Sequence, residues 1–307
     1  MTGGSGFVGS HIVRSLQEKG AKVFVPRSRE YNLVSPEAAR RMCDDHKPEV
    51  VIHGAAYYGG IWINQLYPGR ICYENLLMGV NVMEACRASG VGKLVVLGTA
   101  CAYPGYLEGE LAEKDLWSGL PHETVMNYGI AKRVLAIQGV AYRKQYDFHS
   151  IHVILTNLYG PGDTFNPTRS HVVSALIRKF VEAAQAGGPH VEVWGTGRPV
   201  REFLYVEDCA EAVIRAAEVY DDILPLNIGT GVGTSIRQLA QLIQELSGHT
   251  GVISWNAEKP DGQMKKVLDV TRMTEVLHWT PPISLREGLA KTIAWYVANK
   301  DVADQRE

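Results

Sequence analysis

Short apolar segments alternate with helical segments through the first half of this 307-residue chain. The apolar segments are AKVFVP (21–26), EVVIHGAA (49–56), KLVVLGTA (93–100) and HSIHVILTNLYGP (149–161). Strands that are apolar throughout and separated by helices are typical of a parallel sheet that is covered on both faces. The alternation therefore predicts an α/β fold with a doubly wound parallel Rossmann sheet.

The regular alternation ends near residue 163. Beyond it we expect helices at 171–187 and 207–220, short strands in VEVWGTG, REFLYV and LPLNIGTG, and two further helices. These segments predict a smaller α/β lobe, interleaved with the first domain, that closes over the carboxyl ends of the strands. We expect 1–163 and about 200–228 to form the Rossmann domain, and about 164–199 and 229–307 to form the substrate-binding lobe.

The chain begins with the glycine-rich string MTGGSGFVGS, in which Gly3, Gly6 and Gly9 stand three residues apart. A helical segment starts at the last of these glycines, and a strand follows that helix. Glycines at this spacing let a diphosphate approach the backbone, where Cβ atoms would otherwise obstruct it. The string predicts a dinucleotide site, and the alternative is a flexible surface loop.

A loop of this kind normally follows a buried strand, yet only Met1 and Thr2 precede it here. In a doubly wound sheet we expect that strand in the centre, between 22–26 and 49–56 on one side and 93–98 on the other. Without it, two apolar strands would face a gap with unpaired backbone groups. We therefore expect the first strand to be truncated, with roughly six or more apolar residues missing before Met1.

The end of the second apolar segment bears on the choice of cofactor. An NAD site usually carries Asp or Glu there, to accept from the ribose hydroxyls. This chain has Arg27, Ser28 and Arg29 before any acid appears. Two guanidinium groups and a hydroxyl suit a 2′-phosphate, which favours NADP(H). The alternative is a solvated basic turn.

Composition narrows the classes of partner. The net charge is −2 and no long basic run occurs, so we expect no nucleic-acid partner. No apolar stretch approaches the ~18 residues of a membrane span, and the start does not resemble a signal peptide. The five cysteines are odd in number and form no C-x-x-C pair. We therefore expect reduced thiols in a cytoplasmic protein, and neither a disulfide framework nor a metal site.

Tyr128 and Lys132 in NYGIAK stand one helical turn apart. An ammonium group near a phenol favours the phenolate, so such a tyrosine can exchange a proton with a substrate oxygen. The spacing alone is weak, because Tyr296 and Lys300 repeat it near the end of the chain. The position of Tyr128, about thirty residues after the strand ending in LGTA, favours it as the catalytic tyrosine.

Several motifs together resemble those of the extended short-chain dehydrogenases/reductases, and within them the GDP-L-fucose synthase family. They occur in order along nearly the whole chain: TGGSGFVG (2–9), GGI (59–61), NLLMGVNV (75–82), LGTACAYP (97–104), NYGIAK (127–132), TNLYGPGDTFNPTRSHV (156–172), VWGTGRPVREFLYVED (193–208), NIGTG (227–231) and KPDG (259–262).

The resemblance implies an NADPH-dependent enzyme that epimerises C3 and C5 of GDP-4-keto-6-deoxymannose and then reduces C4, giving GDP-L-fucose. It places Thr99, Tyr128 and Lys132 in the reduction, and Cys101 and His171 as the epimerisation pair. The implied substrate contacts are Lys179, Trp194, Arg201 and Asp261. The implied cofactor contacts are Gly3, Gly4, Ser5, Gly6, Phe7, Val8, Gly9, Leu97, Gly98, Thr99, Ala100, Lys132, Leu155, Thr156, Asn157, Leu158 and His171.

Two positions depart from the family pattern. The family usually carries serine where this chain has Thr99, and arginine is also common where it has Lys179. The family commonly forms dimers through the helices near 75–89 and 128–145, so we expect a homodimer.

For each of these residues a plainer role stays open from the sequence. Cys101 also fits the role of a small core residue, and His171 that of a helix cap or of an exposed imidazole. Arg201 also reads as a surface charge and Trp194 as core. Two other functions also stay open: a sugar-nucleotide 4-epimerase or 4-reductase of the same fold, and an inactive NADPH-binding protein.

Overall fold

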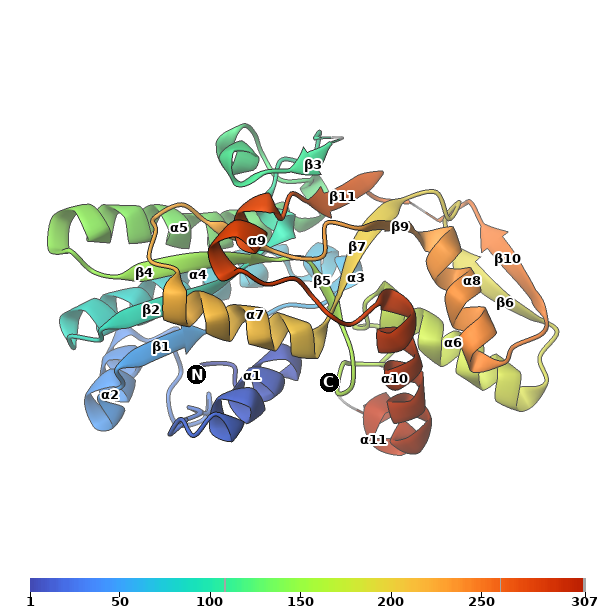
Figure 1. Cartoon of the computed structure of the whole chain (residues 1–307), viewed down its shortest axis with the longest axis horizontal. Coiled ribbons are helices and arrows are strands. Elements are labelled where there is room, and N and C mark those ends of the chain that lie inside the picture. Colours follow the sequence, from blue (N-terminus) through green and yellow to red (C-terminus); the bar gives the residue numbers. More distant parts are fainter. Residues whose placement is uncertain (108, 260, 306–307) are drawn as a thin grey trace.

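The computed structural model describes residues 1–107, 109–259 and 261–305. Its central sheet contains β1 (Val50–His53), β2 (Lys93–Thr99), β4 (Ser150–Leu155) and β8 (Leu226–Ile228), in that order. All neighbouring pairs are parallel. The predicted doubly wound sheet is therefore confirmed (Figure 1).

Helices cover both faces of this sheet because its strands carry apolar side chains on alternate sides. Val95 and Leu97 of β2 pack in one cluster with α1 (Phe7–Glu18) and α7 (Val206–Val219). Leu94 and Val96 face the opposite cluster. That cluster includes residues of α2 (Pro36–His46), α4 (Pro68–Ala88) and α5 (Met126–Tyr146).

Two expectations about the edge of the sheet are wrong. Residues 21–26 form no strand. β1 and β2 pair directly, so the segment at Thr2 does not lie between them. Thr2 instead forms an isolated parallel bridge with His53, and the amino group of Met1 donates to Phe24 O at 2.8 Å. Thr2 therefore lies between β1 and residues 21–26, and two residues are too few to form a ladder with that segment.

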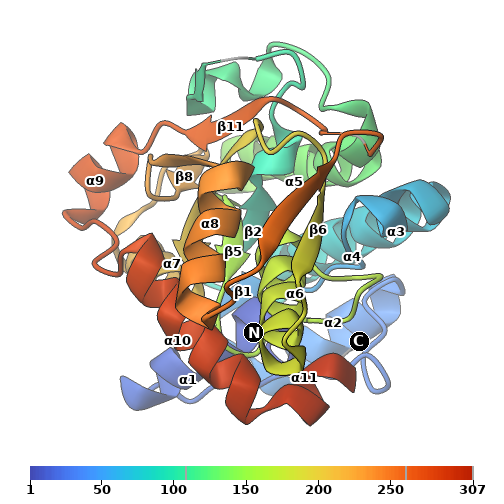
Figure 2. The same cartoon turned by 90° about the vertical axis from the view of Figure 1, so that its right-hand side faces the viewer.

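The smaller lobe lies on the right of Figure 1 and faces the viewer in Figure 2. Its helices and strands are α6 (Val172–Ala186), α8 (Ile236–Ser247), α10 (Leu285–Ala298), α11 (Lys300–Gln305), β6 (His190–Trp194) and β10 (Val252–Asn256). β6 and β10 form a parallel pair, and apolar residues of α6, α8 and α10 share one core cluster with them.

A further sheet joins the two parts of the molecule. It has the order β3 (Glu110–Leu111), β11 (Lys265–Leu268), β7 (Val200–Tyr205) and β5 (Asn157–Tyr159), with β9 (Gly233–Ser235) antiparallel to β7. The remaining short helices are α3 (Ile61–Leu66), η1 (Ala100–Ala102), η2 (Glu113–Trp117) and η3 (Glu123–Val125).

One element of the second half returns to the first. Met273 and Leu277 of α9 (Thr271–Leu277) pack in the same apolar cluster as α1, α7 and the central sheet. We therefore propose that the Rossmann domain consists of 1–163, about 200–228 and also α9, and that the substrate lobe consists of the remaining residues.

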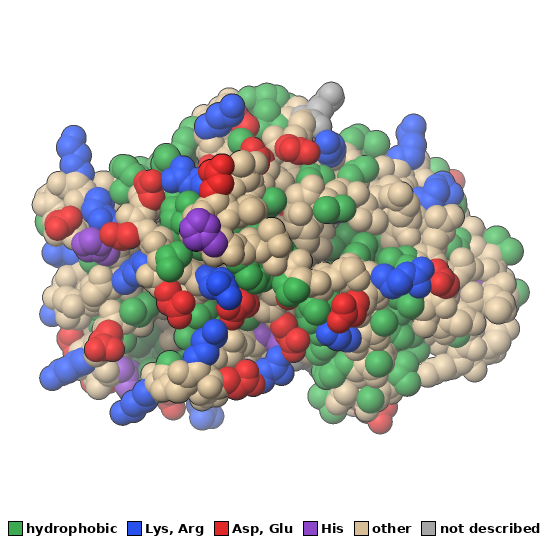
Figure 3. Space-filling view, viewed as in Figure 1, with side chains coloured by type: hydrophobic (Ala, Val, Ile, Leu, Met, Phe, Trp, Pro, Cys, Tyr) green, Lys and Arg blue, Asp and Glu red, His purple; other side chains and the backbone are tan. Residues whose placement is uncertain are grey.

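The surface carries both signs of charge. On the face shown in Figure 3, Lys and Arg side chains are interspersed with Asp and Glu. Within the described part of the chain, none of the helices combines the length and apolarity that crossing a bilayer demands.

Candidate active site

The glycine loop forms one end of a cavity of about 410 Å³ at the carboxyl edge of the central sheet. Gly3 has φ +68°, and a Cβ there would lie 2.6 Å from the carbonyl carbon of Gly54. A Cβ on Gly9 would overlap Gly3 O. Helix α1 starts after Gly6 with no side-chain cap and no acidic residue in its first turn. Its free N–H groups and dipole therefore suit an anion such as a diphosphate.

Most predicted cofactor residues line this cavity. From the glycine loop these are Gly3, Ser5, Gly6, Phe7, Val8 and Gly9, and the strand ends contribute Leu97–Ala100 and Leu155–Leu158. Gly98 has no room for a side chain because the His152 imidazole on β4 occupies that space. Gly4 does not line the cavity, because it faces the methyl groups of Val25.

The predicted 2′-phosphate residues lie outside this cavity. Arg27, Ser28 and Arg29 are exposed and follow the segment whose Val25 packs against Gly4. Their role in choosing the cofactor stays a prediction.

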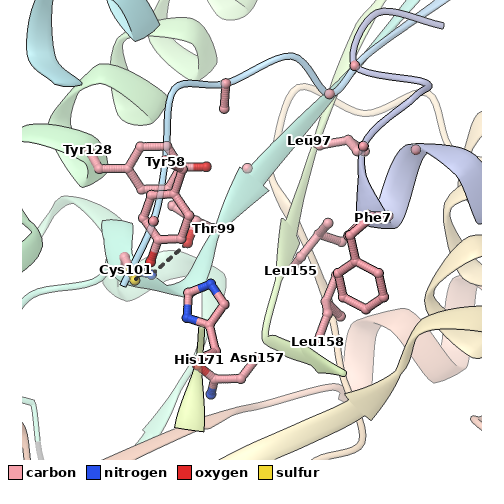
Figure 4. Close-up of a pocket in the computed structure, with 18 of the residues that line it drawn as sticks. Phe7, Tyr58, Leu97, Thr99, Cys101, Tyr128, Leu155, Asn157, Leu158 and His171 are labelled. Atoms are coloured by element: carbon pink, nitrogen blue, oxygen red, sulfur yellow. Dashed lines mark hydrogen bonds between the residues drawn. The ribbon is translucent and has the colours of Figure 1, made fainter. Parts of the chain in front are cut away.

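Thr99, Tyr128 and Lys132 line the same cavity. Figure 4 shows Thr99 and Tyr128 there. Burial lowers the pKa of Lys132 to about 8. Burial also raises the pKa of Tyr128, and the nearby Cys101 adds to this effect. This differs from our expectation that Lys132 favours the phenolate. The Lys132 Nζ lies 5.8 Å from the ring centroid of Tyr128, and burial is the main cause of the raised pKa of Tyr128. Tyr128 is therefore protonated at neutral pH and suited to donate a proton.

Two buried histidines, His53 on β1 and His152 on β4, lie close enough to Lys132 to sense its charge. Burial, together with the charge of Lys132, lowers the pKa of His53 and of His152 to about 3. Both imidazoles are therefore neutral at physiological pH, so they add no charge next to Lys132.

Cys101 lies in the short helix η1 that follows β2. The Thr99 side chain accepts a hydrogen bond from Cys101 N at 3.1 Å and so caps η1. The Lys266 ammonium donates to Cys101 Sγ at 3.6 Å, and the Tyr58 hydroxyl lies 3.9 Å from the same atom. Burial alone would raise the pKa of the Cys101 thiol, but Lys266, Thr99 and Tyr58 together hold it below its usual value. This environment is typical of a reactive thiol rather than a core cysteine.

His171 occupies the N-cap position of α6, but its side chain makes no capping hydrogen bond. Its ring instead stacks on Tyr58, with centroids 5.6 Å apart, and lines the cavity (Figure 4). Its orientation therefore does not fit the alternative role of a helix cap.

A second cavity of about 360 Å³ adjoins the first. The two share Tyr58, Cys101, His171 and Lys266, together with Asn157 and Leu158. Three predicted substrate residues, Trp194, Arg201 and Asp261, line the second cavity. The shared residues therefore lie where a cofactor and a substrate would meet.

Three of the predicted substrate residues, Lys179, Trp194 and Asp261, belong to the smaller lobe. Asp261 accepts from the N–H and the hydroxyl of Thr196, both at 2.7 Å. Trp194 is 61% exposed, so it is not a core residue. Lys179 does not line the cavity, but its ammonium lies 5.5 Å from the Trp194 ring centroid.

β11 brings Lys266 to the site. Lys266 is the register partner of Arg201 on the parallel strand β7, so the two side chains point to the same face. The buried Glu202 carboxylate accepts from the N–H of Leu268 at 2.7 Å and of Gly231 at 3.0 Å. These bonds fix the end of β11 against the turn after β8.

Sequence reasoning missed Tyr58 and Lys266. Tyr58 follows the end of β1, the edge at which a parallel sheet presents its functional loops, and that position was a usable signal. Lys266 is 165 residues from Cys101 and lies outside the motifs that carry the family resemblance.

Comparison with known proteins agrees with this geometry. Residues 1–229 match the model of the NAD dependent epimerase/dehydratase family. The chain is also 40% identical to GDP-L-fucose synthase 1 of Arabidopsis thaliana, covering 97% of this chain and 93% of that protein.

The chain belongs to the NAD-dependent epimerase/dehydratase family. The resemblance to its GDP-L-fucose synthases is thereby confirmed. Two solved structures are also similar to this chain. A GDP-L-fucose synthetase from Naegleria fowleri bound to NADP has a TM-score of 0.90 at 27% identity, covering 99% of this chain and 95% of that one. A GDP-6-OMe-4-keto-L-xylo-heptose reductase from C. jejuni has a TM-score of 0.91 at 28% identity, covering 97% of both chains.

Proposed function

We propose that this family member converts GDP-4-keto-6-deoxymannose to GDP-L-fucose by 3,5-epimerisation and NADPH-dependent 4-reduction. The observation that carries the proposal is that Cys101 and His171 border the same space as Tyr128 and Lys132. A plain 4-reductase needs no second acid–base pair. Full-length similarity to GDP-L-fucose synthases supports the same reading.

The first cavity fits NADP(H). The glycine loop and the start of α1 would hold the diphosphate, and Arg27, Ser28 and Arg29 would take the 2′-phosphate. When bound, NADPH supplies the hydride that is delivered to C4 of the sugar.

The protein's own residues would carry the proton transfers. The C4 ketone acidifies the hydrogens on C3 and C5, so the Cys101 thiolate removes one as a proton. The electron pair moves onto the ketone oxygen as an enolate, and His171 then returns a proton from a ring nitrogen to the opposite face of that carbon, inverting it. Proton exchange with solvent resets both groups before the second carbon is inverted. In the reduction, Tyr128 donates its hydroxyl proton to the ketone oxygen, which the Thr99 hydroxyl polarises.

The nucleotide would lie in the second cavity. Arg201 and Lys179 supply positive charge for a diphosphate, and Arg201 has the fork geometry that binds it bidentately. Trp194 offers an aromatic face and Asp261 an acceptor at the same cavity.

We also propose that the protein is a cytoplasmic homodimer. Exposed apolar side chains occur on α4 and α5, among them Tyr73 (61% exposed) and Ile137 (55%). Pairing of these helices between two copies would cover them. Light scattering of the wild type and of Ile137→Arg tests this: we expect a dimer that the substitution dissociates, and a monomeric wild type would contradict it.

The function is tested with GDP-, dTDP- and UDP-linked 4-keto-6-deoxy sugars and NADPH, with products identified by NMR. We expect turnover of the GDP sugar to a product inverted at C3 and C5. A product that retains both configurations would indicate a simple 4-reductase. Absence of NADPH oxidation with every sugar would indicate an inactive binding protein.

A further inference from the structure

Tyr58 is the one described side chain for which we find contacts to all three candidate proton-transfer groups. Its ring stacks on Tyr128 with centroids 4.2 Å apart and an interplanar angle of 30°. It stacks on His171 with an angle of 24°. Its hydroxyl lies 3.9 Å from Cys101 Sγ. Figure 4 shows the Tyr58 and Tyr128 rings together, with Cys101 and His171 beside them.

We propose that Tyr58 is a positioning residue for the Cys101 base: its stacked ring fixes a hydroxyl that donates a hydrogen bond to the thiolate. The proposal rests on the function proposed above, because only the epimerisation uses that thiolate. A residue that only fills space would not need this hydroxyl.

The direction of this hydrogen bond follows from the chemistry of the two groups. A thiolate carries no proton, so it can only accept. Burial, followed by the nearby Cys101 and Tyr128, raises the pKa of Tyr58 well above its usual value. The phenol therefore keeps its proton at neutral pH and can donate it.

The ring stacks hold this donor in place. Offset aromatic pairs have defined geometry, and Tyr58 is held by one partner from α5 and one from the start of α6. The stacks therefore aim the hydroxyl at Cys101, while the Asn75 side chain holds the loop by accepting from the N–H of Tyr57 and donating to its carbonyl oxygen. Other ionisable groups also face Cys101 or line the two cavities that it borders: Lys266 from β11, Arg201 from β7, Tyr128 and Lys132 from α5, His171 at the start of α6, and His122, Asp163, Arg169 and Asp261 from the loops.

The neighbouring Tyr57 provides a matched control. Its ring contacts the Arg70 guanidinium, 4.1 Å from the ring centroid, and its N–H donates to Asn75. Tyr57 lines neither cavity. Tyr58→Phe and Tyr57→Phe each remove one hydroxyl, and only the first removes a donor from Cys101.

The test follows alkylation of Cys101 by iodoacetamide across a pH range in the intact protein, read by peptide mass spectrometry. Cys101 is partly exposed and lines both cavities, so the reagent can reach it. We expect Tyr58→Phe to move the midpoint of the profile to higher pH and to slow alkylation at neutral pH by roughly 3- to 10-fold. Tyr57→Phe should keep the wild-type midpoint. A Tyr58→Phe profile that overlaps the wild type would overturn the proposal.

A second measurement uses substrate. In deuterated buffer, Tyr58→Phe should slow incorporation of deuterium at C3 and C5 at neutral pH, with kcat reduced, KM kept and the rate recovering at high pH. A uniform loss at every pH would indicate a merely structural role and contradict the proposal. A shifted alkylation profile in a protein whose wild type exchanges no substrate hydrogen would uphold the role of Tyr58 and refute the proposed function.

Discussion

Replacing Lys266 by methionine removes the ammonium group that lies 3.6 Å from Cys101 Sγ. Methionine keeps a flexible side chain of similar length, so packing on β11 changes little. If the ammonium stabilises the Cys101 thiolate, the substitution leaves the thiolate with Tyr58 and Thr99 as its remaining hydrogen-bond donors. We therefore expect the epimerisation to slow while Tyr128, the proton donor of the reduction, stays intact.

The geometry sets the size of the effect. A hydrogen bond to a charged group contributes about 1.5–3 kcal/mol, and ~1.4 kcal/mol corresponds to a factor of ten. The thiolate population at fixed neutral pH should therefore fall by roughly 10- to 150-fold, and hydrogen exchange at C3 and C5 with it. The direction in which the pH dependence of exchange shifts follows from the same contact. Lys266 lowers the pKa of Cys101, so its loss moves the rise of the exchange rate to higher pH.

The assay is deuterium incorporation from solvent, followed by NMR across a pH range. Lys265→Met is the matched control, because Lys265 adjoins Lys266 on β11 and lines neither cavity. It should exchange as the wild type does. Wild-type exchange by Lys266→Met at neutral pH would refute the reasoning, and so would a uniform loss that high pH does not restore.

Two further predictions concern the cofactor site. Replacing Arg27 and Arg29 together by alanine should narrow the preference for NADPH over NADH by about tenfold or more, because charge-assisted bonds to the 2′-phosphate are lost. Steady-state kinetics with both cofactors measure this, and a wild type that prefers NADH would refute the assignment. Gly3→Ala should lower the free energy of unfolding by about 1–3 kcal/mol from the left-handed backbone alone, and by more because its Cβ would lie 2.6 Å from Gly54. Gly20 also has a left-handed backbone, with φ +84°, but no atom lies within 4 Å of a Cβ built there. Denaturant titration should therefore show a smaller loss of unfolding free energy for Gly20→Ala than for Gly3→Ala. Equal losses would contradict the predicted clash between a Cβ at position 3 and Gly54.

The sequence predicted the sheet well because its strands are buried on both faces and leave an apolar signal in the chain. Segments 49–56, 93–100 and 149–161 contain β1, β2 and β4. Segment 21–26 carries the same signal but forms no strand, because pairing depends on a neighbour and only Met1 and Thr2 lie beside it.

The sequence predicted those site residues that belong to a motif. It missed residues whose role depends only on a contact formed in three dimensions. Cys101 and His171 came from motifs, and the structure brings them to one cavity. The ammonium beside Cys101 comes from a strand 165 residues away, and no local pattern encodes that contact. The Tyr–Lys spacing indicates proximity, but it carries no information about the burial that raises the pKa of Tyr128.

Epimerisation and reduction should take place in one site and be separable by mutation. The most direct test follows deuterium exchange and NADPH oxidation in two variants, Tyr128→Phe and Cys101→Ala. Tyr128→Phe should abolish NADPH oxidation while the sugar still exchanges its C3 and C5 hydrogens with deuterated solvent. Cys101→Ala should suppress that exchange by ~10²–10⁴-fold, the range typical of losing a general base, while slow reduction of the unepimerised sugar continues. Exchange at the wild-type rate in Cys101→Ala would contradict the account and return the thiol to the role of a small packed residue.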